Sequence, residues 1–358
     1  MKEVLHSKPW ITDEDRAAVA DVMRSGMLAQ GEKCREFEAA LGAWMGVDEG
    51  GVAVGSGSAA IVLALQALEI GEGDEVVLTS YNCPKVLEAV ATVGATPVPC
   101  DIGEQWRLRP EDVESHLSAR TRAIIVPHLL GIFADTVAFR RFGIPIIEDY
   151  AQALDAKGRR RIARSDIAIF SFHPTKLITT GEGGMALAAD PALTRRMRAI
   201  RDGAASRDRG RLFSPLADLS AALGLSQLAR YPTALERRRK IAAAYRHALQ
   251  PVIPGGFADY PFEHSVFFRF PVKMPGGVEK YRPLFAQRTI RVSNGIDALL
   301  HRALGRPDEA FATSIALFTD TVSLPIYPAL TPEEAQRCVQ AATELFAGVG
   351  RASRAVSA

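Results

Sequence analysis

The sequence predicts an α/β protein with a mostly parallel central sheet, helices on both faces of it, and a smaller C-terminal α+β domain. Short apolar segments alternate with helical patterns from residue 52 to about residue 250, and such alternation is typical of a parallel sheet with crossover helices. A cluster of prolines and glycines at 251–256 interrupts this alternation. We therefore expect a large domain over residues 1–250 and a small domain over 251–358.

Each element is predicted from its local pattern. An acidic cluster suited to a helix start precedes the first apolar positions and predicts a helix at 12–25. A second helix is expected at 34–44, after a short loop bracketed by Gly26 and Gly31. Apolar runs predict strands at 52–54, 75–79, 96–101, 123–127, 144–148, 167–172 and 185–189. Helical patterns lie between or after them at 59–68, 85–93, 109–118, 191–201, 219–228 and 234–249. The small domain is expected to hold strands at 266–272 and 290–292, with helices at 279–287 and 332–346.

Composition excludes several classes of protein. The chain has 358 residues, of which 47% are hydrophobic, enough to bury a large core. Its formal net charge of +2 gives no reason to expect nucleic acid or a membrane surface as a partner. We expect no membrane-spanning segment and no signal peptide. The four cysteines are scattered, without metal-ligand spacing or a disulfide framework, which predicts no metal site and a cytoplasmic location.

The stretch from Ile167 to Gly184, IAIFSFHPTKLITTGEGG, is the strongest functional signal. It places Lys176 just beyond the C-terminal end of a buried strand, where ligands collect in an open parallel sheet. Partial desolvation there lowers the pKa of a lysine, and the neutral amine can form a Schiff base with an aldehyde cofactor. A plain surface lysine at a strand end is the alternative.

A second signal is the strand-to-helix turn Ser56-Gly57-Ser58. Backbone N–H groups at a helix start favour an anion, glycine allows close approach, and serine hydroxyls add donors. The turn is therefore a candidate phosphate site, with an ordinary capped helix as the alternative.

A third signal is the carboxyl end of the strand before Tyr150. Asp149 there could pair with a protonated ring nitrogen, as pyridoxal phosphate requires. Gln152 could lie beside the phenolic oxygen of the same ring. The alternative for Asp149 is a role as the N-cap of the next helix.

Two further polar residues flank the lysine. Ser171 could donate to a phosphate, and His173 could act as an acid–base group or a spacer. A structural hydrogen bond explains each of them equally simply. A phosphate, a pyridinium nitrogen and an aldehyde carbon are the three points at which pyridoxal phosphate is held, so the joint presence of these signals predicts that cofactor.

These motifs resemble the DegT/DnrJ/StrS family of sugar aminotransferases, fold type I enzymes that depend on pyridoxal 5′-phosphate. The resemblance covers nearly the whole chain. It is most specific in FSFHPTKLITTGEGG at 170–184, and continues in segments such as VGSGSAAIVLAL at 54–65, HLLGIFAD at 128–135, EDYAQA at 148–153 and LPIYP at 324–328.

The resemblance implies a role for each matched position. Lys176 would carry the covalent link to the cofactor and move the proton, and Asp149 would pair with the pyridine nitrogen. Gly57, Ser58 and Ser171 would hold the phosphate. It also implies a homodimer and transfer of an amino group, usually from glutamate or glutamine, to a nucleotide-linked keto sugar in polysaccharide or antibiotic biosynthesis.

The chain departs from the family pattern at two places. Cys83 stands where an aromatic residue normally covers the cofactor ring, with Tyr81 nearby in sequence. Phe213 and Pro215 stand where an Asn and an Arg normally reach the phosphate across the dimer. Arg211 or Ser214 is a candidate to compensate.

Three other functions therefore stay open. One is a dehydratase of the same family, although those members carry His where this chain has Lys176. Another is an aminotransferase or dehydratase acting on a non-sugar ring, such as a cyclitol or an aromatic precursor. The last is a non-catalytic protein built on the same fold.

Overall fold

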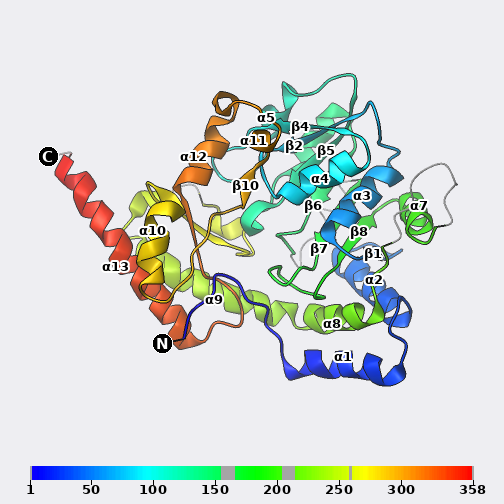
Figure 1. Ribbon diagram of the computed structural model, residues 1–358, viewed down its shortest axis with the longest axis horizontal. Coiled ribbons are helices and arrows are strands. Elements are labelled where there is room, and N and C mark those ends of the chain that lie inside the picture. The colour runs from blue at the N-terminus through cyan, green and yellow to red at the C-terminus, as the bar shows by residue number, and fades with distance from the viewer. Residues whose placement is uncertain (1, 155–165, 204–213, 258–259, 357–358) are drawn as a thin grey trace.

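The computed structural model describes residues 2–154, 166–203, 214–257 and 260–356. A seven-stranded sheet forms its centre, in the order β1-β8-β7-β6-β5-β2-β4 (Figure 1). The strands are β1 (Val52–Val54), β2 (Glu75–Thr79), β4 (Thr96–Cys100), β5 (Thr121–Pro127), β6 (Ile146–Asp149), β7 (Ile167–Ser171) and β8 (Gly184–Ala188). β4, β2, β5, β6 and β7 run parallel, while β8 is antiparallel to both β7 and β1. The sheet is therefore mostly parallel, as predicted.

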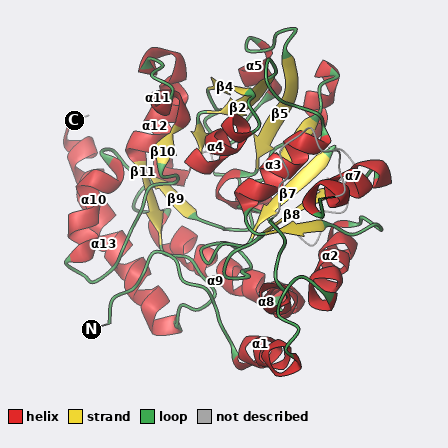
Figure 2. Ribbon diagram, turned by 45° about the vertical axis from the view of Figure 1, so that its right-hand side comes forward, coloured by secondary structure: helices red, strands yellow, loops and turns green. Residues whose placement is uncertain are grey.

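Helices cover both faces of this sheet (Figure 2). They are α1 (Asp13–Ser25), α2 (Glu32–Met45), α3 (Gly57–Ala67), α4 (Pro84–Thr92), α5 (Pro110–Glu114), α7 (Pro191–Arg201), α8 (Asp218–Ala229) and α9 (Tyr231–Leu249). α3, α4 and α7 pack on one face, and α2 and α8 on the other. Neighbouring strand residues point to opposite faces, so Ile169 joins the first core and Phe170 the second. This burial on both sides explains why the strands read as continuous apolar runs.

A C-terminal lobe packs beside the sheet. Its antiparallel pair joins β9 (Phe270–Lys273) and β11 (Thr321–Leu324), and its helices are α10 (Gly277–Ala286), α11 (Leu300–Ala303), α12 (Ala312–Asp320) and α13 (Pro332–Val356). A further short pair, β3 (Tyr81–Asn82) with β10 (Ala298–Leu299), connects the lobe to the large one. Of the helices in the described ranges, none has an apolar stretch long enough to cross a bilayer.

The N-terminal arm, residues 2–11, crosses from the C-terminal lobe to the large one (Figure 1). Val4 pairs with Ile290 and is fully buried in the core of the C-terminal lobe. The arm therefore belongs in part to the lobe formed by the other end of the chain. A division into domains at 1–250 and 251–358 stays a prediction.

Several predicted elements differ from the structure. The helix expected at 109–118 is shorter in the structure: α5 begins at Pro110 and ends at Glu114. The strand expected at 266–272 begins four residues later, since Phe267 has a φ of +52° that no strand residue adopts. The residues at 290–292 form a single bridge, not a strand. β11 and α12 were absent from the sequence-based prediction.

Candidate active site

Lys176 lies in the turn that follows β7. Its N–H donates to the carbonyl of His173 at 2.9 Å, and its Nζ lies 5.4 Å from the centre of the Phe268 ring. The side chain is half-buried, and burial lowers the pKa of its amine, although the nearby Asp149 and Cys83 act in the opposite direction. A lowered pKa increases the fraction of neutral amine, which is the nucleophilic form.

Asp149 ends β6, the strand beside β7. Its side chain is buried, and Oδ1 accepts the N–H of Ala151 at 2.8 Å. Oδ2 accepts no hydrogen bond from any residue in the described ranges. Burial raises the pKa of the carboxyl from its ordinary value, while the Ala151 N–H and the neighbouring Lys176 oppose this. An incoming cationic N–H donor would supply the missing partner for this carboxylate.

A buried hydrogen-bonded pair, His128 and Glu148, lies behind Asp149. His128 and Glu148 are both fully buried, and His128 Nε2 donates to Glu148 Oε2 at 3.0 Å. The N–H of Ala134 donates to Nδ1 at 3.1 Å, so Nε2 must carry the ring proton. The backbone N–H of His128 donates to the Asp149 carbonyl at 3.0 Å. This pair therefore braces the strand end that presents Asp149.

The sequence-based reasoning missed this pair. Both residues lie in segments already singled out, HLLGIFAD and EDYAQA. A histidine and a glutamate at the ends of two adjacent apolar strands were the available signal. Their pairing depends on β5 and β6 being neighbours in the sheet.

The N-terminus of α3 forms the third part of the site. Ser56 caps this helix, because its side chain accepts the N–H of Ala59 at 3.1 Å. The N–H groups of Gly57 and Ser58 have no acceptor among the residues that the structure describes. A Cβ on Gly57 would lie 2.8 Å from the Cβ of Ser171, so the turn and the end of β7 are in close contact. Free N–H groups beside a serine hydroxyl form a suitable anion site.

Gly184 explains how closely this turn packs. A Cβ on Gly184 would lie 2.3 Å from the carbonyl oxygen of Ser56 and 2.7 Å from the nitrogen of Gly57. Only glycine allows this approach of two backbones. The last glycine of the GEGG motif, at the start of β8, therefore packs directly against the backbone of the Ser56–Gly57 turn.

The other predicted site residues take different positions. Gln152 Oε1 accepts the N–H of Leu130 at 2.7 Å, which leaves its amide N–H₂ group to donate. Cys83 precedes α4, and burial raises the pKa of its thiol, with Lys176 and Asp149 within electrostatic range. His173 is exposed, and its Nδ1 interacts with the Thr175 hydroxyl at 3.0 Å. A role for His173 in proton transfer stays a prediction.

The structure places some of the residues at which the chain departs from the family pattern. Phe213 and Arg211 lie outside the described residues. Ser214 lies beside the phosphate turn, where its carbonyl and hydroxyl oxygens accept the N–H of Gly55 at 2.9 and 3.3 Å. Tyr81 is fully buried in the core of the C-terminal lobe. It is therefore not available to cover the face of a cofactor.

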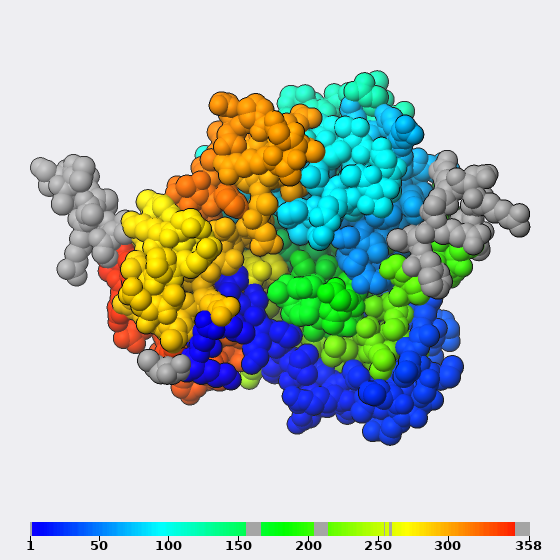
Figure 3. Space-filling model, viewed as in Figure 1, coloured from blue at the N-terminus to red at the C-terminus, as the bar shows by residue number. Residues whose placement is uncertain are grey.

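These groups lie where the two lobes meet. In Figure 3 the segment that follows β7, in bright green, reaches the surface beside the dark blue N-terminal arm. The ends of β6 and β7, the start of α3 and the Phe268 segment thus come together from distant parts of the sequence.

A family model and solved structures identify the chain. The model of the DegT/DnrJ/EryC1/StrS aminotransferase family matches residues 9–343. The chain belongs to this family. It is a fold type I aminotransferase that depends on pyridoxal 5′-phosphate.

Similar structures span almost the full length of the chain. S. venezuelae DesV, solved with a ketimine intermediate, is 32% identical with a TM-score of 0.84, over 93% of this chain and 94% of DesV. The aminotransferase TlmJ from Streptoalloteichus hindustanus is 28% identical with a TM-score of 0.87, over 99% of each chain. Spr1654 from Streptococcus pneumoniae, solved in PLP and PMP forms, is 27% and 26% identical, each with a TM-score of 0.83, over at least 98% of each chain.

The residues of this DegT-family chain fit the cofactor. The free N–H groups of α3 and the Gly57–Ser171 contact suit its phosphate, and the unpaired oxygen of Asp149 suits its ring nitrogen. Gln152 presents an amide N–H₂ group, and Lys176 an amine of lowered pKa. Each charged or polar part of pyridoxal phosphate thus has a complementary group at the meeting of the two lobes.

Proposed function

We propose that this enzyme transfers an amino group from glutamate or glutamine to a nucleotide-linked keto sugar, in polysaccharide or antibiotic biosynthesis. Membership of the DegT family supports the reaction type. The similarity to Spr1654, which is assigned as a sugar aminotransferase, supports the acceptor class. The single observation that carries the proposal is the placement of Lys176 and Asp149 at the ends of adjacent strands, within electrostatic range of each other.

Each residue then has a defined role. When bound, pyridoxal phosphate supplies an aldehyde that condenses with amines and a ring that accepts electrons. Lys176 Nζ is the nucleophile that holds the cofactor, and after release it moves the proton at the reacting carbon. Asp149 keeps the ring nitrogen protonated, and Gln152 donates to the ring oxygen. Ser56, Gly57, Ser58 and Ser171 would hold the phosphate, and Cys83 would lie on one side of the ring.

We also propose that the enzyme works as a homodimer in the cytoplasm. Met23, near the end of α1, and Met27, just after that helix, are 65% and 73% exposed. Exposed apolar side chains of this size favour a partner surface. All four cysteines are free, which suits a reducing compartment. Sedimentation equilibrium would give the mass of a dimer; a monomer mass at micromolar concentration would contradict this part.

Replacing the lysine tests the function. In Lys176→Ala, the rate at which glutamate or glutamine converts the cofactor should fall by about 10⁴-fold, because nucleophile and proton carrier are lost together. The measurement is the bleaching of the yellow cofactor band. Lys240→Ala, on the exposed side of α9, is the matched control. Retained turnover in Lys176→Ala would refute the role of the lysine.

The acceptor is tested separately. After the amino donor has bleached the cofactor, the cofactor carries the amino group. Adding the right member of a panel of nucleotide-linked keto sugars should then restore the yellow band. Return only with a keto cyclitol or an aromatic ketone would favour the non-sugar alternative. A wild-type protein that forms no yellow band with added cofactor would favour the non-catalytic alternative.

A further inference from the structure

Arg269, in the segment before β9, is a cation without a matching carboxylate. Its Nε is buried without a hydrogen-bond partner. No Asp or Glu in the described part of the chain lies within ion-pair distance of its guanidinium. Burial lowers the pKa of this guanidinium to about 10, and Asp297 acts against the shift from a longer distance. An unmatched buried charge is costly, so this position suits an anion that arrives from outside.

The N-terminal arm fixes the orientation of this guanidinium. Arg269 Nη1 donates to His6 Nδ1 at 3.2 Å and to the Ser7 hydroxyl. His6 Nε2 is 3.0 Å from the Ser323 hydroxyl, and burial lowers the pKa of His6 well below its ordinary value. His6 is therefore a neutral acceptor. The arm orients Arg269 without neutralising it.

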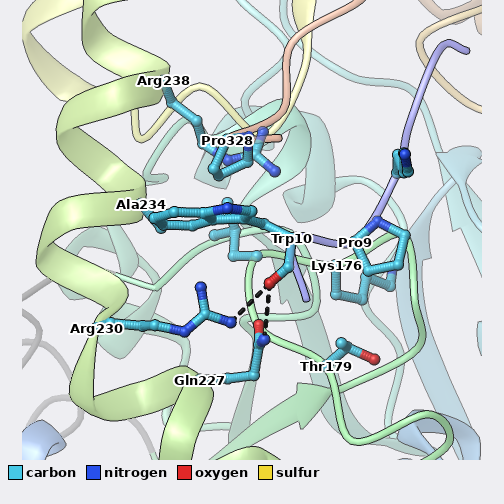
Figure 4. A pocket seen from close by; sticks show the side chains of 11 residues that line it. Pro9, Trp10, Lys176, Thr179, Gln227, Arg230, Ala234, Arg238 and Pro328 are labelled. Carbon is cyan, nitrogen blue, oxygen red and sulfur yellow. Dashed lines mark hydrogen bonds between the residues drawn. The ribbon is translucent and has the colours of Figure 1, made fainter. Parts of the chain in front are cut away.

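The same arm that contacts Arg269 also passes beside Lys176. Beyond Ser7 it runs past Pro9, which lines the same pocket as Lys176 (Figure 4). It is anchored by Trp10, whose ring lies 4.6 Å from the Arg230 guanidinium and whose carbonyl accepts hydrogen bonds from Gln227 and Arg230.

The Phe268 ring links the two cations. Its centre is 5.4 Å from Lys176 Nζ and 4.6 Å from the guanidinium carbon of Arg269. Arg269 also contributes to lowering the pKa of Lys176. Both side chains therefore lie against one aromatic ring, at the meeting of the lobes.

We propose that Arg269 binds the α-carboxylate of the amino donor. This inference rests on the proposed function, because it requires an amino acid that reacts at Lys176. The donor's α-carboxylate carbon is only two bonds from the nitrogen that reacts, so the carboxylate must lie close to the lysine. A phosphate of a nucleotide-linked acceptor is many bonds from its reacting carbonyl. The planar guanidinium matches a carboxylate in geometry and charge.

The test compares amino acids with amines that lack the α-carboxylate. The wild type, loaded with cofactor, is first assayed for bleaching with L-glutamate, L-glutamine and 4-aminobutyrate. In Arg269→Met, the second-order rate constant for the better L-amino acid should fall by about a hundredfold. The rate constant for 4-aminobutyrate should change less than about threefold. Arg269→Lys should recover part of the loss, because it retains the charge.

Controls separate the possible failures. Arg282→Met, an exposed arginine on α10, should behave as wild type, and melting temperatures report whether each variant folds. A structural role for Arg269 would lower both rate constants equally, and that result would overturn the inference. Calorimetric binding of α-methyl-L-glutamate gives a second readout, and unchanged affinity in Arg269→Met would also overturn it. A wild type that no L-amino acid bleaches would instead overturn the proposed function.

Discussion

At the scale of single residues, the environment of each titratable group decides its chemistry. Lys176 and Asp149 are both shifted toward their neutral forms by burial, although each attracts the other. Neither side chain forms an ion pair shorter than 4 Å within the described ranges. The two groups therefore influence each other electrostatically without forming an ion pair.

The buried Glu148–His128 pair gives a prediction at this scale. Burial alone would raise the pKa of Glu148, but the interaction with His128 and the hydrogen bonds of Tyr150 and Thr136 together more than offset it, so the pKa is lowered from 4.5. A carboxyl with a depressed pKa stabilises the fold above its unfolded pKa, and this contribution is lost as the pH falls through the folded pKa. Glu148→Gln should lower the free energy of unfolding by about 1–2 kcal/mol at pH 7.

The pH dependence of the stability difference shows whether the carboxylate charge of Glu148 causes it. The difference between wild type and Glu148→Gln should start to shrink near pH 4.5, where the carboxyl becomes protonated in the unfolded chain, and should vanish as the pH falls through the lowered pKa of the folded protein. Urea unfolding of the cofactor-free protein at several pH values measures this. Glu111→Gln, an exposed glutamate, is the control. A difference that stays constant down to pH 3 would contradict the assignment of charge to Glu148.

At the scale of elements, the site is built from the ends of strands and the start of a helix. α3 is buried on nearly all sides, which holds its N-terminus rigidly against the ends of β7 and β8. The glycines at these contacts permit backbone approaches that a side chain would prevent. The proposed phosphate site thus depends on the packing between these three elements.

Gly57→Ala tests this contact. The new Cβ would meet the Cβ of Ser171 at 2.8 Å and its hydroxyl at 3.1 Å, so the two elements must separate slightly. We expect the dissociation constant of pyridoxal phosphate to rise about tenfold, since overpacking of this kind costs about 1–3 kcal/mol. Fluorescence titration of the cofactor-free protein measures the change.

A matched glycine provides the control for this experiment. A Cβ on Gly71 would meet only the carbonyl of Val93, at an ordinary 3.5 Å, so Gly71→Ala should leave the cofactor affinity unchanged. Equal affinities for Gly57→Ala and wild type would show that the turn does not hold the phosphate.

At the scale of the whole molecule, polar contacts add to the β3–β10 pair and the shared apolar core that join the two lobes. Asp101 follows β4 in the large lobe, and its carboxylate accepts the N–H groups of Thr313 and Ser314 at 2.9 and 2.7 Å, and the Ser314 hydroxyl at 2.6 Å. It therefore caps α12 of the C-terminal lobe from outside that lobe.

Removing this cap should loosen the connection. We expect Asp101→Ala to lower the free energy of unfolding by about 1–2 kcal/mol, the range for a lost helix cap. Amide hydrogen exchange at 312–320 should become faster, while exchange in β5 and β6 stays slow. Glu309→Ala, exposed next to α12, is the control. Unchanged exchange at 312–320 would show that α12 does not depend on Asp101.

Local sequence patterns predicted those features of the protein that depend on neighbouring residues in the chain. The strand–helix alternation, the lysine at a strand end and the glycine-serine turn are each readable within about 20 residues, because period and turn chemistry are short-range. The C-terminal lobe was predicted less well. Its strands are short, and positive φ at Phe267 delays β9, a feature set by packing against the segment at Gly131.

The sequence by itself therefore determined the fold class and the family, and it predicted the cofactor-binding motifs and the reactive lysine. Tertiary structure alone decided that His128 pairs with Glu148 and that the first ten residues fix Arg269 beside Lys176. The physical reason is that such pairings depend on which strands are neighbours and on where the arm crosses between the lobes. These are long-range contacts, and no local periodicity in the chain records them.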